Sequence, residues 1–471
     1  MPTFSGKFQY LNSDASALQA GPCRVSFEAE TLTLTPASGA PLALDFGDID
    51  VFLPGEYDLT LTLYTGKKIL LNQFGKTFQN LSHDLLEAYR KRLLQCLLLE
   101  DLEEITRFDG TVRLESPARA FSSPAELRLY KSNLAVLPTQ ATGLQWRFAD
   151  IDAVSFDETT WAVAAESGDE RLAISKLAKR TEEFRERLTN AMDELAQQGA
   201  ETVHGLFPFL SPDQFQQAAV LMKEGRAASL AKLRAIDPKT EQALTTNVVD
   251  AKLKPYFDAL LAHVPAGNYY AGFKLLRKDE EQAEQEQQPH EAGEGATEAA
   301  GAEAGAEEAA EPSAEPEADT DNEEEAQPIL HWFFLPLAAK SGAKYPSNLV
   351  AWEATSRSGR ATYFFRLVPL EQAAQLEDAS KSAALVETAI RQLNRAIVLL
   401  NFRREPIYLP DDSLLLQPRF RRYAIACRKL PELVRLRSSF LGRAIHTTPA
   451  AWQKQFESYL AKAYTRAQGV E

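Results

Sequence analysis

The sequence predicts an α+β protein in which two similar antiparallel β units, each closed by a C-terminal helix, precede a helical spacer and a C-terminal antiparallel sheet with further helices. Three observations support this fold class: a block that occurs twice, alternating apolar and polar runs that precede a helical period, and an acidic low-complexity segment between two strand-like runs. We expect the two units at residues 1–107 and 108–199, the helical spacer at 200–266, and the C-terminal α+β domain at 267–471, with a disordered acidic insertion at 279–325.

The duplicated block is Phe-Gly-Asp-Ile-Asp at residues 46–50, which recurs as Phe-Ala-Asp-Ile-Asp at residues 148–152, an offset of 102. Other matches keep the same order at nearly the same offset: residues 32–36 match 134–138, and the Phe-x-Gly block that starts at Phe4 recurs at an offset of 104. Small changes of offset are what loop insertions produce, and a period near 100 is the size of a domain. The block therefore indicates a duplicated domain.

Each copy begins with short runs of alternating apolar and polar residues, which predict strands with one face toward water. In the first copy these runs lie at residues 24–27, 31–34, 59–64 and 68–71. The period then changes to three and four, as at Leu81, Leu85 and Tyr89 in the first copy and at Phe184 and Leu188 in the second. This change predicts one amphipathic helix at the end of each unit.

Short antiparallel strands followed by one helix within about 100 residues resemble the pleckstrin-homology (PH-like) superfold. The resemblance covers residues 1–107 and 108–199 and implies a strongly bent sheet with the helix at one open end. It implies that the Phe and Ile of the repeated block point into the core, and that its Asp pair faces outward or caps a turn. A D-x-D pair can also bind a metal, but no His or further carboxylate cluster stands beside either copy, so we favour the turn.

After the duplication, apolar stripes predict helices between residues 201 and 266, for which a DNA-binding helix-turn-helix is the alternative to simple structural helices. A four-stranded antiparallel meander and three helices follow. The expected strands lie at 269–276, 329–335, 348–355 and 361–367, and the expected helices at 382–403, 420–446 and 450–467. The order of sheet and then helix suggests a third unit of the same kind.

The acidic insertion dominates the charge of the chain. Of 66 acidic and 51 basic residues, 19 acidic and no basic ones lie in residues 279–325, which leaves 47 acids against 51 bases elsewhere. The insertion has no aromatic residue and no Leu, Ile, Val or Met, so it cannot bury enough apolar surface to fold. Because strand-like runs flank it directly, we expect a disordered loop within a hairpin.

The stretch from Lys381 to the C-terminus is basic, with 16 Lys and Arg against 7 acids, and aromatic residues are interleaved. Such a composition is typical of a phosphate- or nucleic-acid-binding surface. The alternatives are that these cations pair with acids of their own domain, or that the acidic loop screens them. The candidate anion- or nucleic-acid-binding residues are Arg403, Arg404, Arg419, Arg421, Arg422, Arg428, Lys429, Arg435, Arg437 and Arg443.

Local signatures of catalysis are absent from the sequence. It has no P-loop, no G-x-G-x-x-G, no G-x-S-x-G and no kinase signature, and its six His residues are far apart, so we predict no catalytic or metal-binding residue and no cofactor. Lipid-binding PH-like domains carry a basic cluster on the first hairpin. The first copy has only Lys7 and Arg24 there, so we do not expect a membrane lipid as partner.

We predict a non-catalytic interaction or scaffold protein that uses its PH-like units as docking faces and modulates a basic C-terminal surface with the acidic loop. The alternative is an acidic, chaperone-like binder of basic proteins or a nucleic-acid-associated factor, since the plan is similar to that of the FACT histone-chaperone subunits. A third hypothesis is an enzyme with a dispersed site in the C-terminal domain. The start of the chain lacks the pattern of a signal peptide and no apolar run could span a bilayer, so we expect a cytoplasmic protein.

Overall fold

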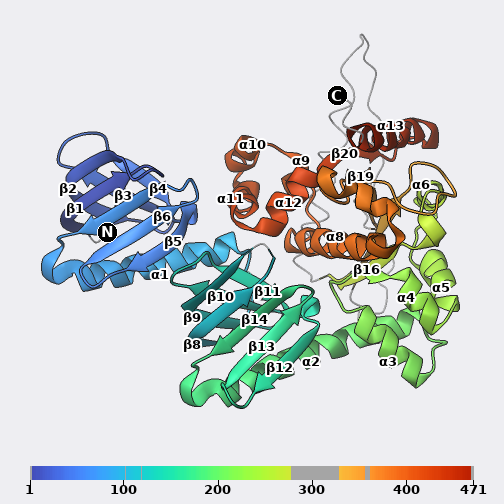
Figure 1. Cartoon of the computed structure of the whole chain (residues 1–471), viewed down its shortest axis with the longest axis horizontal. Coiled ribbons are helices and arrows are strands. Elements are labelled where there is room, and N and C mark those ends of the chain that lie inside the picture. The colour runs from blue at the N-terminus through green and yellow to red at the C-terminus, as the bar shows by residue number, and fades with distance from the viewer. Residues whose placement is uncertain (1–2, 101, 118, 277–327, 356–360, 468–471) are drawn as a thin grey trace, which may run out of the picture.

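The computed structural model describes residues 3–100, 102–117, 119–276, 328–355 and 361–467 (Figure 1). The predicted acidic insertion at 279–325 lies outside the described residues. The α+β fold class is confirmed: two seven-stranded antiparallel curled sheets, each followed by a helix, precede further helices and a third antiparallel sheet.

The first sheet has the strand order β4-β3-β2-β1-β7-β6-β5, and the helix α1 (Phe78–Cys96) follows it. Its strands are β1 (Thr3–Leu11), β2 (Ala17–Phe27), β3 (Thr31–Pro36), β4 (Leu42–Asp45), β5 (Ile49–Pro54), β6 (Asp58–Leu63) and β7 (Lys68–Asn72). The short 3-10 helices η1 (Phe46–Asp48) and η2 (Gly75–Thr77) connect β4 to β5 and β7 to α1.

The second sheet repeats this topology strand by strand in the order β11-β10-β9-β8-β14-β13-β12, followed by α2 (Thr181–Leu206). Its elements are β8 (Glu104–Glu115), β9 (Ala120–Tyr130), β10 (Asn133–Pro138), β11 (Leu144–Arg147), η3 (Phe148–Asp150), β12 (Ala153–Asp157), β13 (Ala162–Ser167), β14 (Glu170–Ser175) and η4 (Ala178–Arg180). The repeated block therefore occupies the same place in both units, at the 3-10 turn that leads to the edge strand.

The apolar side chains of the repeated block point into the core, as predicted. Phe46, Ile49 and Ile151 are fully buried and Phe148 nearly so. In the first unit the sheet and α1 enclose this core, because β3 and β6 bury every second residue. The second unit encloses its own cluster, which includes Phe108 packed edge-on against Phe184 of α2 at 5.2 Å.

The helix α1 also packs on the outer face of the second sheet. Arg90 pairs with Glu126 at 2.8 Å, and the carbonyl of Leu97 accepts a hydrogen bond from Gln145 at 2.5 Å. Ala135 and Leu137, which point away from the core of the second unit, belong to the same buried cluster as α1. The sheet of the second unit is therefore covered on both faces at β10, whose six residues are all buried.

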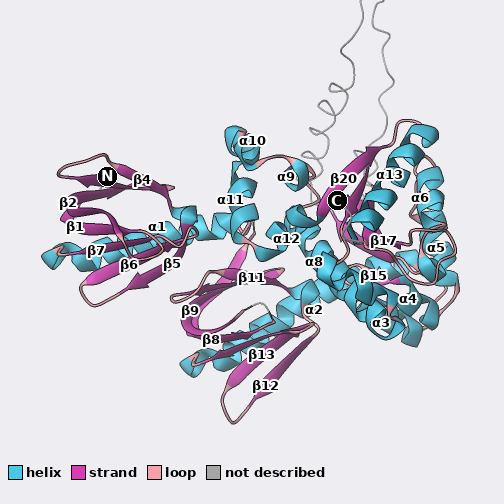
Figure 2. Ribbon diagram, turned by 45° about the horizontal axis from the view of Figure 1, so that its top comes forward, coloured by secondary structure: helices cyan, strands magenta, loops and turns pink. Residues whose placement is uncertain are grey.

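The remaining helices surround a six-stranded antiparallel sheet of order β15-β16-β17-β18-β19-β20 (Figure 2). The strands are β15 (Ala228–Ser229), β16 (Tyr270–Leu275), β17 (Ile329–Leu337), β18 (Leu349–Ala354), β19 (Ala361–Phe365) and β20 (Phe440–Ile445). The helices before the sheet are α3 (Pro212–Leu221), α4 (Leu230–Ile236), α5 (Lys239–Asn247), α6 (Lys254–Leu261) and η5 (Pro265–Gly267). Those after β19 are η6 (Leu370–Glu377), α8 (Ala379–Leu399), α9 (Glu405–Tyr408), α10 (Asp411–Leu416), η7 (Pro418–Phe420), α11 (Arg421–Lys429), α12 (Pro431–Ser439) and α13 (Pro449–Ala467).

The structure corrects two expectations about this sheet. The predicted helix over residues 420–446 is instead α11, α12 and the edge strand β20, because Pro431 begins a new helix and cannot continue the previous one. The sheet also has six strands where four were predicted, since the two-residue β15 of the expected helical spacer pairs with β16.

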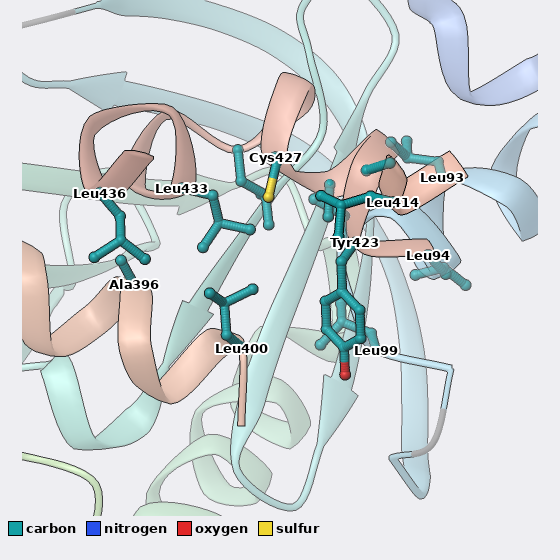
Figure 3. Close-up of a cluster of buried hydrophobic side chains, with 14 of the residues drawn as sticks. Leu93, Leu94, Leu99, Ala396, Leu400, Leu414, Tyr423, Cys427, Leu433 and Leu436 are labelled. Atoms are coloured by element: carbon teal, nitrogen blue, oxygen red, sulfur yellow. The ribbon is translucent and has the colours of Figure 1, made fainter. Parts of the chain in front are cut away.

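Both faces of the third sheet are buried, which is why β17 reads as an almost continuous apolar run. On one face, Trp332 and Trp352 share a buried cluster with α8, α11, α12 and the end of α1. On the other face, Phe333 and Phe364 pack with α3 to α6 and α13. Figure 3 shows where the first unit joins the C-terminal helices: the labelled side chains come from α1, α8, α10, α11 and α12, except Leu99 and Leu400, which follow α1 and α8.

Candidate functional site

The repeated turns of both units, residues 45–50 and 147–152, dock on the C-terminal helices. In the first turn, Asp45 accepts a hydrogen bond from the backbone N–H of Gly47 at 2.7 Å and so caps η1. Two nitrogens of Arg92 hold the same carboxylate, each at 2.9 Å. This bidentate pair fixes the turn to α1, because the planar guanidinium matches the carboxylate geometry.

Lys429 of α11 binds the backbone of the first turn. Its Nζ donates to the carbonyl oxygens of Gly47 at 2.9 Å and Ile49 at 2.5 Å, and lies 3.9 Å from Asp50. Burial lowers the pKa of Lys429, although the neighbouring acidic groups oppose this effect. The adjacent Arg428 lies 3.6 Å from Asp48. Lys429, which was predicted from the sequence to bind an external anion, therefore makes an internal contact.

The first turn approaches α11 closely at Gly47. A Cβ built on Gly47 would lie 2.8 Å from Cγ2 of Ile425 and 3.0 Å from Sγ of Cys96. The second copy has Ala149 at this position. The glycine of the first copy thus permits an approach of Ile425 and Cys96 that a Cβ would obstruct.

In the second turn, Asp150 is buried, so the expectation that the Asp pair faces outward or caps a turn is wrong for this residue, whereas Asp152 is exposed. Arg147 holds the carboxylate of Asp150 through two hydrogen bonds of 2.8 Å, and Arg395 of α8 lies 3.4 Å away. Burial alone would raise the pKa of Asp150, but Arg147, Arg395 and Arg226 keep that pKa below its ordinary value. A buried carboxylate is tolerated here because several cations compensate for its lost hydration.

The second Asp of this turn binds two further cations. Asp152 lies 2.8 Å from Arg391 of α8 and 2.8 Å from Arg226. Lys223 donates to the carbonyl oxygen of Ile151 at 3.0 Å, as Lys429 does in the first turn. Each repeated turn is therefore held by a lysine on its backbone and by arginines on its carboxylates. Arg391 and Arg395 were not among the residues predicted from the sequence, although the repeated Asp pairs were a signal that these carboxylates have cationic partners.

The structure disperses the ten candidate basic residues. Arg437 bonds the carbonyl of Leu409 and pairs with Asp411, both at 2.9 Å. Arg404 and Arg443 lie over the rings of Tyr363 and Tyr408 at 5.8 and 4.4 Å. Together with the docking contacts of α11, these interactions turn much of the candidate surface inward.

Three of the ten residues are exposed: Arg419, Arg421 and Arg435. Arg419 lies over the ring of Phe420 at 4.5 Å, and Arg421 is 3.9 Å from Glu30. The last two, Arg403 and Arg422, both lie over the ring of Tyr423, at 5.9 and 5.0 Å from its centroid.

Arg403 and Arg422 line a cleft of about 770 Å³ at the meeting point of the second unit, α2, the third sheet and α11. Its lining includes the turn between β9 and β10, the middle of α2, the end of β16 and the end of α8. Clefts of this size between structural units are typical binding sites. Both residues were predicted from the sequence as candidate anion-binding residues, but no local sequence pattern indicates the cleft.

A buried cluster around His446 resembles part of a catalytic arrangement but lacks its geometry. Nε2 of His446 lies 3.2 Å from Glu353 and 3.0 Å from the hydroxyl of Thr362, which also accepts a hydrogen bond from Trp452 at 2.9 Å. In a catalytic triad the acid and the nucleophile use opposite ring nitrogens. Here both contact the same one, and the His446 ring stacks on Tyr256. The cluster therefore holds β18, β19 and α13 together.

Within the described residues, no group of three or more His, Cys, Asp or Glu side chains could hold a metal ion. In the same part of the chain, no helix combines the length and apolar character needed to cross a bilayer. The three cysteines are buried and free.

Fold and contacts together define a class of protein: a duplicated sheet-and-helix protein whose repeated turns dock on a C-terminal α+β part. No protein-family model and no curated protein matches the chain. Among solved structures, the chain is similar to one titled "Structure of the Spt16D Pob3N heterodimer", with 16% identity over 36% of this chain and 84% of that chain and a TM-score of 0.15. At this TM-score the similarity carries no argument about function.

Proposed function

We propose that this is a non-catalytic interaction protein whose folded part holds the acidic segment, residues 279–325, and presents it to a basic partner protein. The observation that carries this proposal is the hairpin from which the segment departs. The backbone N–H of Leu276 donates to the carbonyl of Pro328 at 2.9 Å, so the two ends of the intervening chain are held side by side.

The hairpin itself is regular. β16 and β17 pair without a register shift from Tyr270 opposite Phe334 to Leu275 opposite Ile329. Because the sheet behind it is buried on both faces, the two attachment points are fixed relative to the rest of the protein. The segment carries 19 carboxylates and no cation, which favours a basic partner through long-range attraction.

We further propose that the two duplicated units are PH-like domains that serve as docking faces for proteins, as the predicted bent sheet and closing helix support. The proposed division stays at residues 1–107, 108–199, 200–266 and 267–471. Because the helices of the spacer share a buried cluster with the third sheet, we expect the last two parts to unfold together. A cytoplasmic location and the absence of enzymatic activity stay predictions.

A second candidate function is supported by the exposed cations Arg419, Arg421 and Arg435. As exposed cations, they can each contact a polyanion such as nucleic acid, which the acidic segment would screen. The larger basic surface predicted from the sequence is reduced by the internal contacts of Lys429, Arg428 and Arg437.

The test compares the full chain with three variants. In the first, residues 279–325 are deleted. In the second, every Asp and Glu within residues 279–325 is changed to Asn or Gln, and in the third, the order of residues 279–325 is scrambled. Binding of poly-L-lysine and of heparin is measured by fluorescence anisotropy at two salt concentrations. We expect the full chain and the scrambled version to bind poly-L-lysine, more strongly at low salt, and the other two to lose this binding.

The scrambled version is the matched control, since it keeps length and charge. Equal poly-L-lysine binding by the deletion would contradict the proposal. Stronger heparin binding by the deletion and the amide version would favour the second candidate, in which the segment screens Arg419, Arg421 and Arg435.

A further inference from the structure

We propose that the central cleft binds an extended polypeptide segment of a partner protein, and that an acidic side chain of this segment is held by Arg403. The cleft is the 770 Å³ space bounded by the second unit, α2, the end of β16, the end of α8 and α11. This inference does not depend on the function proposed above.

Arg403 has a side chain that the described residues leave partly unpaired. Its Nε is buried and has no hydrogen-bond partner among them. Its guanidinium stacks on Tyr423 at 5.9 Å, which orients the side chain but supplies no hydrogen-bond acceptor. A buried donor without an acceptor is unfavourable, so an acceptor that reached Nε would stabilise the site. A carboxylate is the best match, because it accepts two parallel hydrogen bonds from one guanidinium.

The backbone before Arg403 is strained. Asn401 and Phe402 both have left-handed conformations, with φ of 49° and 59°. Asn tolerates this region, but Phe rarely adopts it. Phe402 is held by its ring, which lies 4.7 Å from that of Trp332. Strain of this kind is concentrated at functional sites. Here the left-handed turn lets the chain pass from the buried Phe402 to Arg403, which lines the cleft.

The charges of the lining favour a segment with both signs of charge over a polyanion. Five cations and four carboxylates line the cleft. Two of the carboxylates, Glu194 and Glu201, are exposed on α2, and no ion pair is recorded for either within the described chain. A nucleic acid or a multiply charged phosphate would meet these carboxylates and be repelled. A peptide can direct one acidic side chain to Arg403 and basic ones to α2.

The lining also offers groups for a peptide backbone. Of the amide side chains that line the cleft, Asn133 and Gln145 bond to each other at 2.6 Å, and Asn401 accepts a hydrogen bond from Lys274. Gln198 is exposed on α2, and its amide can both donate to and accept from a peptide group. Leu195, Val398 and Leu399 supply apolar contacts. A mixture of apolar surface and a few polar groups is characteristic of binding clefts.

The experiment is a selection from a displayed library of random twelve-residue peptides against the full chain, with counter-selection against Arg403→Leu. We expect enriched peptides to carry an acidic residue and, at a fixed distance from it, a basic residue. Their affinity should fall at least tenfold in Arg403→Leu and severalfold in the double variant Glu194→Gln/Glu201→Gln. Arg419→Leu is the matched control, since Arg419 also stacks on a ring but is exposed outside the cleft.

A charge exchange completes the test. If the acidic residue of a selected peptide contacts Arg403, then Arg403→Glu should lose the peptide and regain it when that residue becomes Arg. The melting temperature of Arg403→Leu should be equal to that of the natural protein or slightly higher, because the substitution removes a buried unpaired donor. A library that yields no Arg403-dependent peptide, equal loss in Arg419→Leu, or failure of the charge exchange would overturn the proposal.

Discussion

The Nζ of Lys429 lies 2.9 Å from the carbonyl oxygen of Gly47, which joins α11 near the C-terminus to the first repeated turn. Lys429 also bonds the carbonyl oxygen of Ile49 at 2.5 Å, and at the second repeated turn Lys223 bonds that of the equivalent Ile151 at 3.0 Å. The repeated block is therefore preserved as a docking element as well as a piece of core.

Lys429→Met should destabilise the protein by about 2 kcal/mol, because the carbonyl oxygens of Gly47 and Ile49 lose their buried donor. Urea unfolding measures the loss. Hydrogen exchange should show faster exchange in β5, which begins at Ile49. The control is Arg435→Met on the exposed side of α12, which should change stability by less than about 0.5 kcal/mol. Equal effects of the two substitutions would show that Lys429 does not hold the turn.

Gly47→Ala should destabilise the protein by about 1–3 kcal/mol, since the new Cβ would lie 2.8 Å from Cγ2 of Ile425. Neither the turn nor Ile425 can move away without disturbing the packing of α11 against the first unit. Gly205→Ala, also a glycine-to-alanine change, is the control. A Cβ at Gly205 would meet nothing within 4 Å, so this helical position should be neutral or slightly stabilised. Differential scanning calorimetry compares the two. A melting temperature unchanged by Gly47→Ala would mean that the two surfaces separate easily.

Asp150→Asn should be among the most damaging single substitutions, at about 3 kcal/mol, because Arg147 would lose its buried counter-charge. Asp48→Asn, at the equivalent position of the first turn, removes a partly exposed carboxylate 3.6 Å from Arg428 and should cost less than about 1 kcal/mol. Equilibrium unfolding in urea measures both values. If the order of the two effects were reversed, the buried network would not be the main contact of the second turn.

His331 should make stability depend on pH. Burial lowers its pKa to about 4 from an ordinary value of 6.5, and its Nε2 has no hydrogen-bond partner in the described chain. Between these pH values the unfolded state binds a proton that the folded state does not. Stability should therefore fall as the pH drops from about 6.5 to 4, by up to about 3 kcal/mol.

The measurement is the difference in unfolding free energy between the natural protein and His331→Gln across this pH range, which cancels the contribution of the carboxylates. We expect the difference to change steadily as the pH falls from 6.5 to 4 and to be constant above pH 7.5. A difference that stays constant across the whole range would show that the imidazole is protonated in the folded protein as readily as in the unfolded chain.

The duplication and the hairpin could be predicted from local sequence. The strand and helix periods of the two units depend on neighbouring residues, and the repeat at an offset of 102 identifies them as copies. The strands on either side of the acidic segment were predicted because each is a short apolar run. β20 was missed because its six residues follow two helices directly and form a strand only through pairing with β19.

A comparison of the two copies contained one further signal. Thr33 and Thr35 of the first unit correspond to Ala135 and Leu137 of the second, and these positions point away from the unit's own core. The change from polar to apolar side chains indicates that the second sheet has a covered outer face, which α1 provides. The sequence does not say which element covers it, since apolar contact is not directional.

By itself, the sequence determined the two similar units, the closing helices and the strand pair that flanks the acidic segment, because these depend on periodicity over a few residues. Only the tertiary structure decided the roles of the basic residues. Lys429 and Gly47 are 382 residues apart, and Arg391 and Asp152 are 239 apart. The local sequence around a basic residue looks the same whether its side chain faces solvent, binds a ligand or pairs with a buried carboxylate. Its role follows from the three-dimensional packing that decides which charges lose water together.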